Sequence, residues 1–187
     1  IIRRPDSHSS IEAYARHLIA TLSRPYQLGG QQVFIGASAG YAMGPHDGDT
    51  VDSLSRHADL ALYKSKDKGG NGVEAYVPIL LAQAEERLWL EQELRTALEK
   101  QELQIYYQPV VNAASEQLIG FESLLRWHSA KLGSVGPARF IPIAEESRLI
   151  NPIGEWVLRT ACHEAMSWPA HLKVAVNVSP EQLTNPQ

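Results

Sequence analysis

Apolar residues recur every three or four positions in two stretches of the first 77 residues, from near Ser9 to Pro25 and from Thr50 to Lys66. This spacing is typical of amphipathic helices, so it predicts two helices. Segments 33–43 and 72–77 are short apolar stretches next to glycines, which favours strands. The first part of the chain is therefore expected to hold two helices and two strands.

A longer amphipathic helix is predicted between about Ile79 and Lys100, where the sequence contains no glycine or proline. Its apolar positions repeat at helical spacing, first at Leu81, Ala84 and Leu88 and then at Leu90, Leu94 and Ala97. The pattern leaves three roles open: a connector between domains, a dimer-forming face, or the first helix of the next domain. We place the domain boundary near residue 78, which gives domains 1–77 and 78–187.

Strand and helix patterns alternate in the second half of the chain. Segments 102–111, 117–127 and 172–179 are predicted strands, and segments 137–149 and 150–168 are predicted helices. This alternation predicts an α/β fold, in which a barrel or a layered sheet is the usual architecture.

The polar residues of these strands share one phase. Glu122 and Arg126 stand four residues apart, so both point to one face of their strand. Gln108 and Asn177 fall on the corresponding face of the other two strands. If the strands run parallel in a (β/α) barrel, these side chains converge at the rim formed by the C-terminal ends of the strands, where active sites lie. The alternative that the pattern leaves open is a face that is only exposed to water.

These residue types suggest metal and phosphate chemistry. A carboxylate and an amide oxygen are hard ligands that suit Mg²⁺ or Mn²⁺, while Arg126 and Gln108 could hold a phosphate and a base. No nucleophile–base pair accompanies them, and His163-Glu164 lacks the second histidine of a zinc-protease helix.

Composition narrows the class of protein only slightly. The chain has 187 residues, 44% hydrophobic and 20% charged, and its formal net charge of -4 does not favour a nucleic-acid partner. A single cysteine excludes an internal disulfide, and no apolar run approaches the roughly 20 residues of a membrane span. We expect a cytoplasmic chain cut from a longer protein, because it lacks an initiator methionine; the parent could carry a membrane anchor elsewhere.

The second half resembles the EAL family of bacterial cyclic-di-GMP phosphodiesterases. The resemblance covers about residues 86–187 and rests on a series of motifs in order: YYQP, GFESLLRW, FIPIAEESRLI, GEWVLRTAC and VAVNVSPEQL. The signature tripeptide is Glu122-Ser123-Leu124 in place of Glu-Ala-Leu, and Ser123 is expected to face away from the site.

This resemblance implies the first part of an atypical TIM barrel. It also implies that the catalytic residue Glu122 and Asn177 are ligands of Mg²⁺ or Mn²⁺, and that Gln108 and Arg126 contact cyclic-di-GMP. The complete domain would hydrolyse cyclic-di-GMP to linear pGpG. Later strands of the family supply further ligands, and a TIM barrel needs about 250 residues, so this chain is expected to be inactive alone.

Residues 1–77 resemble the C-terminal half of a GGDEF (diguanylate cyclase-like) domain, an α+β fold. The motifs are GASAGYAMGPHDGDT and ADLALYKSKDKGGNG. The resemblance implies that Lys66 contacts nucleotide phosphates, as at a GTP site; the alternative is a cation that only stabilises a helix C-terminus. Gly70 stands where the family has a phosphate-binding arginine. The GGDEF half is therefore expected to contribute regulation and not efficient cyclase activity.

Two other functions remain open. One is a catalytically degenerate module that senses cyclic-di-GMP or GTP and regulates a partner through the long helix. The other is a purely structural interaction domain, which would not need the four polar strand residues. The expected partners are cyclic-di-GMP, GTP at the GGDEF half, and a second copy of the protein in a homodimer, with no nucleic acid polymer.

Overall fold

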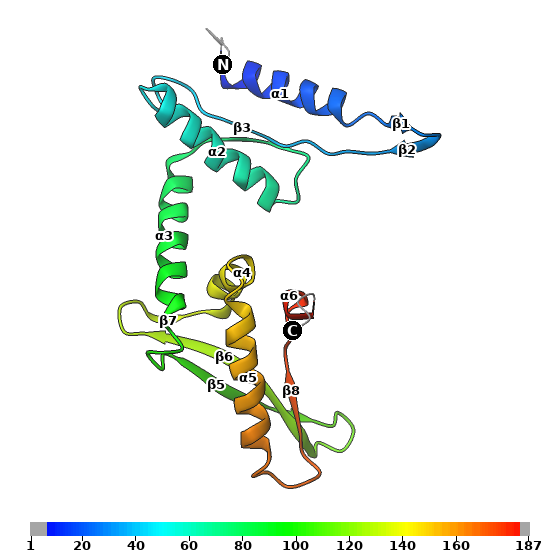
Figure 1. The fold of residues 1–187 in the computed structure, drawn as a ribbon, viewed down its shortest axis with the longest axis vertical. Coiled ribbons are helices and arrows are strands. Elements are labelled where there is room, and N and C mark those ends of the chain that lie inside the picture. The colour runs from blue at the N-terminus through cyan, green and yellow to red at the C-terminus, as the bar shows by residue number, and fades with distance from the viewer. Residues whose placement is uncertain (1–6, 184–187) are drawn as a thin grey trace. The chain divides into compact units, whose positions relative to one another are not determined.

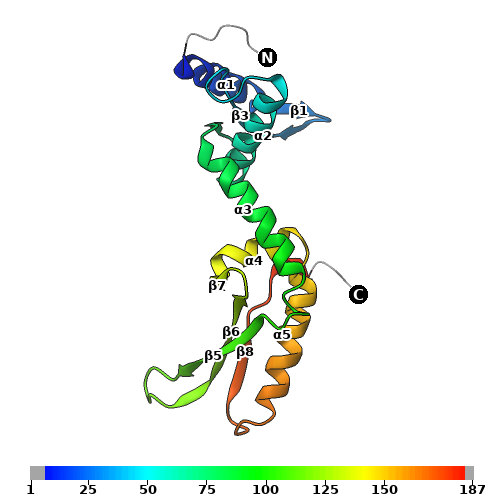
Figure 2. The same ribbon diagram turned by 90° about the vertical axis from the view of Figure 1, so that its left-hand side faces the viewer.

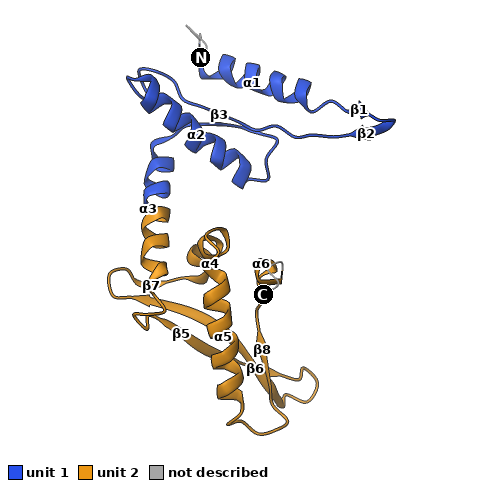
Figure 3. Ribbon diagram, viewed as in Figure 1, with its two compact units in different colours: residues 1–86 blue, residues 87–187 orange. Residues whose placement is uncertain are grey.

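Residues 7–183 are described by the computed structural model of the chain (Figures 1 and 2). They form two compact units that divide between Glu86 and Arg87 (Figure 3). The mixed α/β class expected from the pattern is confirmed by the elements of both units.

Unit 1 consists of two helices and two small sheets. Strands β1 and β2 form an antiparallel hairpin, and β3 pairs with β4 in parallel. Helix α2 packs on β3 so closely that a Cβ atom on Gly40 would lie 2.0 Å from the backbone nitrogen of Leu62. Glycine is therefore required at position 40 for the helix to cover this strand. The elements are α1 His8–Leu22, β1 Tyr26–Leu28, β2 Gln31–Val33, β3 Ala39–Tyr41, α2 Val51–Asp67 and β4 Val73–Ala75.

The predicted elements of unit 1 are found, but one strand is shorter than expected. Thr50 caps α2, since its side chain accepts a hydrogen bond from the Ser53 backbone at 3.1 Å. The segment predicted as one strand, 33–43, contains the end of β2 and the three residues of β3. Strand structure is defined by pairing, and only three residues of this segment pair with β4.

Helix α3, Pro78–Arg95, is the predicted long helix, and it ends five residues before Lys100. Leu80 belongs to the core cluster of unit 1, whereas Leu90 and Leu94 belong to the core of unit 2. The helix therefore contributes apolar side chains to both units. The boundary near residue 78 stays a prediction. Throughout residues 7–183, no helix combines the length and the apolar character needed to cross a membrane.

Unit 2 is built on the long central strand β6. It pairs with β5 and β7 in antiparallel fashion and with β8 in parallel. Helices α4 and α5 form the connection that leads to β8 (Figure 1). The elements are β5 Leu103–Val111, β6 Leu118–Ser129, β7 Gly133–Val135, α4 Pro137–Glu146, α5 Ile150–Ala165, β8 Lys173–Val176 and α6 Pro180–Leu183.

The pairing of β5 with β6 corrects one expectation. A parallel barrel was expected, but the six residues 112–117 between these strands are too few for a parallel crossover. Asn112 closes the connection, because its side-chain oxygen accepts hydrogen bonds from the backbone of Ala114 (2.9 Å) and Ser115 (3.1 Å). Within residues 7–183 the sheet has four strands and does not close into a barrel.

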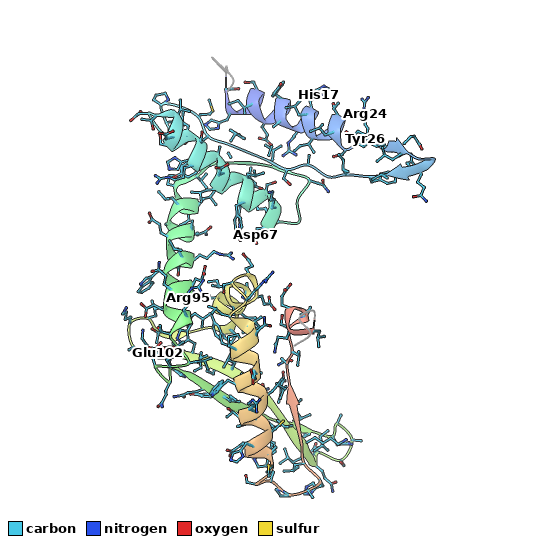
Figure 4. All side chains as sticks on the ribbon, in the orientation of Figure 1. His17, Arg24, Tyr26, Asp67, Arg95 and Glu102 are labelled. Carbon is cyan, nitrogen blue, oxygen red and sulfur yellow. The ribbon has the colours of Figure 1, made fainter. Side chains whose placement is uncertain are left out.

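The core of unit 2 lies between the sheet and helices α4 and α5. Trp127 of β6 is fully buried, and its ring meets that of Phe140 edge-on with centroids 5.7 Å apart. Glu102, labelled in Figure 4, accepts hydrogen bonds from the Trp127 indole and the Ala130 backbone, both at 3.1 Å. The tryptophan thus fills the core while its one polar group has a partner.

A charged cluster ties the end of α3 to the hairpin of β6 and β7. Glu93 lies 2.5 Å from the Lys131 ammonium and 3.4 Å from that of Lys100. The hydrogen bond from Lys131 is the main cause of a lowered Glu93 pKa, which Lys100 lowers further although burial opposes it.

We expect this cluster to make the stability of unit 2 depend on acid pH. Because the folded-state pKa of Glu93 is lowered, its contribution is present above the ordinary glutamate pKa of about 4.3 and is lost as pH falls through the folded value. Glu93→Gln should therefore lower the free energy of unfolding at pH 7 and make it depend less on pH between 7 and 3. Urea unfolding between pH 7 and pH 3 measures this. Parallel curves for the two proteins would contradict the assignment.

Candidate functional site

The polar residues predicted to share a face do lie on one side of the unit 2 sheet. Gln108 of β5 and Ala175 of β8 are both register partners of Glu122, on either side of β6. Arg126 has Gln104 as its partner on β5. Direct partners in a sheet point to the same face, so these side chains stand opposite the face that packs on the helices.

Asn177 and Glu122 are in contact, although 55 residues separate them. Asn177 follows the end of β8, two residues after Ala175, and therefore projects to the same side as Glu122. Its Nδ2 atom donates to Glu122 Oε1 at 2.8 Å. The close approach expected of this pair is observed, while the metal-binding role of both residues stays a prediction.

The reason for the convergence differs from the one expected. We expected the C-terminal ends of parallel strands to bring the polar residues together. Strand β8 does run parallel to β6, but Gln108 is the register partner of Glu122 on β5, which runs antiparallel to β6. The antiparallel register of β5 and β6 therefore places Gln108 beside Glu122, where a parallel crossover connection was expected to do so.

Arg126 lies over an aromatic ring on this polar face. Its guanidinium carbon is 5.7 Å from the centre of the Tyr106 ring, and its Nη1 donates to the Leu125 carbonyl at 2.9 Å. The Tyr106 hydroxyl is 3.4 Å from Nε2 of His128. Sequence reasoning gave Tyr106 and His128 no role, although Tyr106 has the same strand phase as Gln108.

Ser123 points to the opposite face, as expected. It is 4% exposed, and its hydroxyl donates to the Ala175 carbonyl on β8 at 3.0 Å. The residue that departs from the Glu-Ala-Leu signature therefore stabilises the pairing of two strands and does not project beside Glu122.

The metal-ligand set in the described residues is small. No group of three or more histidine, cysteine, aspartate or glutamate side chains is placed to hold a metal ion in residues 7–183. Glu122 and Asn177 offer one carboxylate and one amide oxygen, which suit a hard cation but do not fill the six positions that Mg²⁺ requires.

Lys66 belongs to unit 1, where it is an exposed residue in the last turn of α2. The turn that follows has three successive residues in the left-handed region: Gly69 (φ 101°), Gly70 (φ 74°) and Asn71 (φ 55°). An arginine at position 70 would carry backbone strain in this turn. The glycine at this position therefore has a structural reason, and the cation expected from the family motif is not available there.

Both resemblances are confirmed by family models. Residues 91–187, just over half of the chain, match the EAL domain, and residues 1–72 match the diguanylate cyclase GGDEF domain.

Two curated relatives are named as cyclic di-GMP phosphodiesterases, and one of them is also named as a diguanylate cyclase. The bifunctional diguanylate cyclase/cyclic di-GMP phosphodiesterase MucR of Pseudomonas aeruginosa is 41% identical over 91% of this chain and 26% of MucR. The cyclic di-GMP phosphodiesterase PdeR of Escherichia coli K12 is 36% identical over 96% of this chain and 27% of PdeR.

A solved PaMucR phosphodiesterase structure, described as a c-di-GMP complex, is 42% identical, covering 49% of this chain and 38% of that chain with a TM-score of 0.46. The chain spans only about a quarter of the length of MucR and PdeR.

Proposed function

The chain belongs to the EAL domain family, and on that premise we propose that the full-length protein carrying it is a phosphodiesterase that hydrolyses cyclic-di-GMP to linear pGpG. The observation that carries the proposal is the 2.8 Å contact between Asn177 and Glu122 on a sheet face that also presents Gln108 and Arg126. The names of MucR and PdeR support the same substrate and reaction.

We further propose that Glu122 and Asn177 hold part of a divalent metal site. The fit rests on their donor atoms: a carboxylate and an amide oxygen are ligands of Mg²⁺ and Mn²⁺, and rotation of the Asn177 amide exchanges its nitrogen for its oxygen towards the site. When bound, such an ion supplies Lewis-acid polarisation of the phosphate and lowers the pKa of a water molecule. The remaining ligands would come from other parts of the full-length protein.

In this proposal the other polar residues hold the substrate. Arg126 neutralises and orients a phosphate, because a guanidinium presents several donors to phosphate oxygens. Gln108, opposite Glu122, offers both an amide donor and an amide acceptor to a guanine base. Binding the phosphodiester in one orientation beside Glu122 is the contribution of these side chains to catalysis.

Arg126→Ala is therefore expected to raise the KM of the full-length protein for cyclic-di-GMP by about ten- to hundredfold, the range for one lost charge-assisted hydrogen bond. The turnover number should fall less, since Arg126 orients phosphate and does not hold the metal. Steady-state hydrolysis with Mg²⁺ or Mn²⁺ gives both constants.

A matched control for this substitution is Arg159→Ala, an exposed arginine on α5 that pairs with Glu155 at 2.9 Å. This variant should keep the wild-type KM. An unchanged KM in Arg126→Ala, or an equal increase in both variants, would contradict a substrate-binding role for Arg126.

A second candidate function, a sensor module, is favoured for the GGDEF half by the turn at Gly70. A left-handed glycine in place of a phosphate-binding arginine leaves one of the two phosphate contacts implied by the family motif, that of Lys66, which supports GTP binding without efficient cyclisation. On this proposal GTP at unit 1 regulates the EAL domain through α3. The homodimer and the cytoplasmic location stay predictions.

A further inference from the structure

The loop that carries Asn177 is held by side chains from helices α4 and α6 of unit 2. Residues 177–179 connect β8 to the short helix α6, and Asn177 is the first of them. We propose that Glu145, Ser179 and Gln182 are positioning residues that fix Asn177 beside Glu122 and so determine metal affinity. This inference rests on the proposed metal site, and it assigns a role to three residues outside it.

The first contact joins the loop to α4. The Ser179 hydroxyl donates to Glu145 Oε1 at 2.7 Å, although 34 residues separate the two. Glu145 is held in place because its neighbours Ile143 and Ala144 are buried in the core. A hydrogen bond to an ionised carboxylate is among the stronger ones, so this contact restrains Ser179, two residues beyond Asn177.

The second contact joins the loop to α5. Gln182 Oε1 accepts a hydrogen bond from the Ser179 backbone at 3.1 Å, which folds the Gln182 side chain back over the loop. Its amide then lies against Gly154 of α5, where a Cβ atom would be 2.0 Å from Nε2 of Gln182. A Cβ atom at position 154 would therefore displace the Gln182 amide from this position against α5.

A cavity beside the loop makes the position of the loop more dependent on these contacts. It has a volume of about 300 Å³, and Asn177, Ser179, Gln182 and Glu145 are among the residues that line it. A loop that borders open space is not held by close apolar packing on that side. Among the described residues, the polar contacts of Ser179 therefore hold the loop where Asn177 approaches Glu122 at 2.8 Å.

The test is Mn²⁺ binding to the full-length protein, measured by the loss of the free-ion electron paramagnetic resonance signal in metal-stripped buffer. Glu145→Ala and Ser179→Ala should each weaken Mn²⁺ binding by about tenfold, the lower end of the effect of outer-shell partners on metal sites. Because the two residues act through one hydrogen bond, the double variant should lose no more than either single variant. Gln182→Ala should weaken binding in the same direction.

Conservative variants separate positioning from direct participation. Ser179→Thr and Glu145→Gln keep the hydroxyl donor and an oxygen acceptor, so both should bind Mn²⁺ more tightly than the corresponding alanine variants. The matched control is Glu146→Ala, which removes the adjacent carboxylate of α4 that pairs with Arg87. This control should leave Mn²⁺ affinity unchanged.

Three results would overturn the inference: wild-type affinity in Glu145→Ala and Ser179→Ala, additive losses in the double variant, or an equal loss in Glu145→Gln. Hydrolysis gives an independent readout, since the metal concentration for half-maximal activity should rise in the alanine variants while KM for cyclic-di-GMP stays unchanged. If the wild type binds Mn²⁺ but hydrolyses nothing, the proposed function fails while the Mn²⁺ titrations still decide the role of the loop contacts.

Discussion

Glu122→Gln is expected to lower turnover of cyclic-di-GMP by the full-length protein about a hundredfold or more. The substitution keeps the volume of the side chain and an oxygen that accepts from Asn177, but it removes the negative charge that offsets a bound cation. A lost metal ligand should cost at least as much as the loss of an outer-shell partner, which reaches about 100-fold in affinity. Initial rates over a range of Mg²⁺ and Mn²⁺ concentrations measure the effect.

The matched control is Ser123→Ala, which changes the next residue of the same strand. Ser123 faces the helices, so hydrolysis should stay at the wild-type rate. Stability should fall by about 1 kcal/mol, because the hydrogen bond to the Ala175 carbonyl is lost. Full activity in Glu122→Gln would refute the metal-ligand assignment, and a comparable loss in Ser123→Ala would show that the strand was disturbed as a whole.

Trp127→Ala is expected to cause the largest loss of stability, about 3–5 kcal/mol, as is usual when a buried aromatic residue is truncated. The ring is fully buried against Phe140, and its removal also takes away one hydrogen bond to Glu102. Urea unfolding followed by tryptophan fluorescence measures this in unit 2, which contains all four tryptophans of the chain.

Trp89→Ala serves as the control for that measurement. Trp89 lies on α3 and is 41% exposed, so its truncation should cost less than about 1 kcal/mol. Similar losses in the two variants would show that burial of Trp127 is not what stabilises unit 2.

The phase of the strands could be predicted from the sequence, because side chains alternate with a fixed period of two. That rule placed Gln108, Glu122, Arg126 and Asn177 on one face before any partner strand was known. It also placed Ser123 on the other face, where its hydroxyl bonds to β8. The sequence motifs indicated the EAL family, which the phase of the strands alone does not identify.

The direction of the β5–β6 pairing was predicted wrongly, because alternation looks the same in parallel and antiparallel strands. The short connection with Asn112 was the available signal, since a crossover needs a dozen or more residues. Strand β7 was missed for a different reason. Its three residues have no apolar period of their own, and they form a strand because they pair with residues 127–129 of β6.

The end of α3 and the contacts of the Asn177 loop depend on tertiary structure. The apolar pattern continues to Ala97, but the chain turns after Arg95, and Glu102 bonds to Trp127. Helix α6 begins at Pro180 and was not predicted, although a serine followed by a proline is typical of a helix start. Nothing in the local sequence indicated that Ser179 would bond to Glu145, because that contact joins segments 34 residues apart.

The central claim is tested most directly by incubating the full-length protein with cyclic-di-GMP and Mg²⁺ or Mn²⁺ and separating the nucleotides by chromatography. We expect linear pGpG to accumulate, to stop forming when the metal is chelated, and to resume when metal is added back. Cyclic-di-GMP that is bound and recovered intact, with the same affinity in the presence and absence of metal, would contradict the phosphodiesterase and favour a sensor.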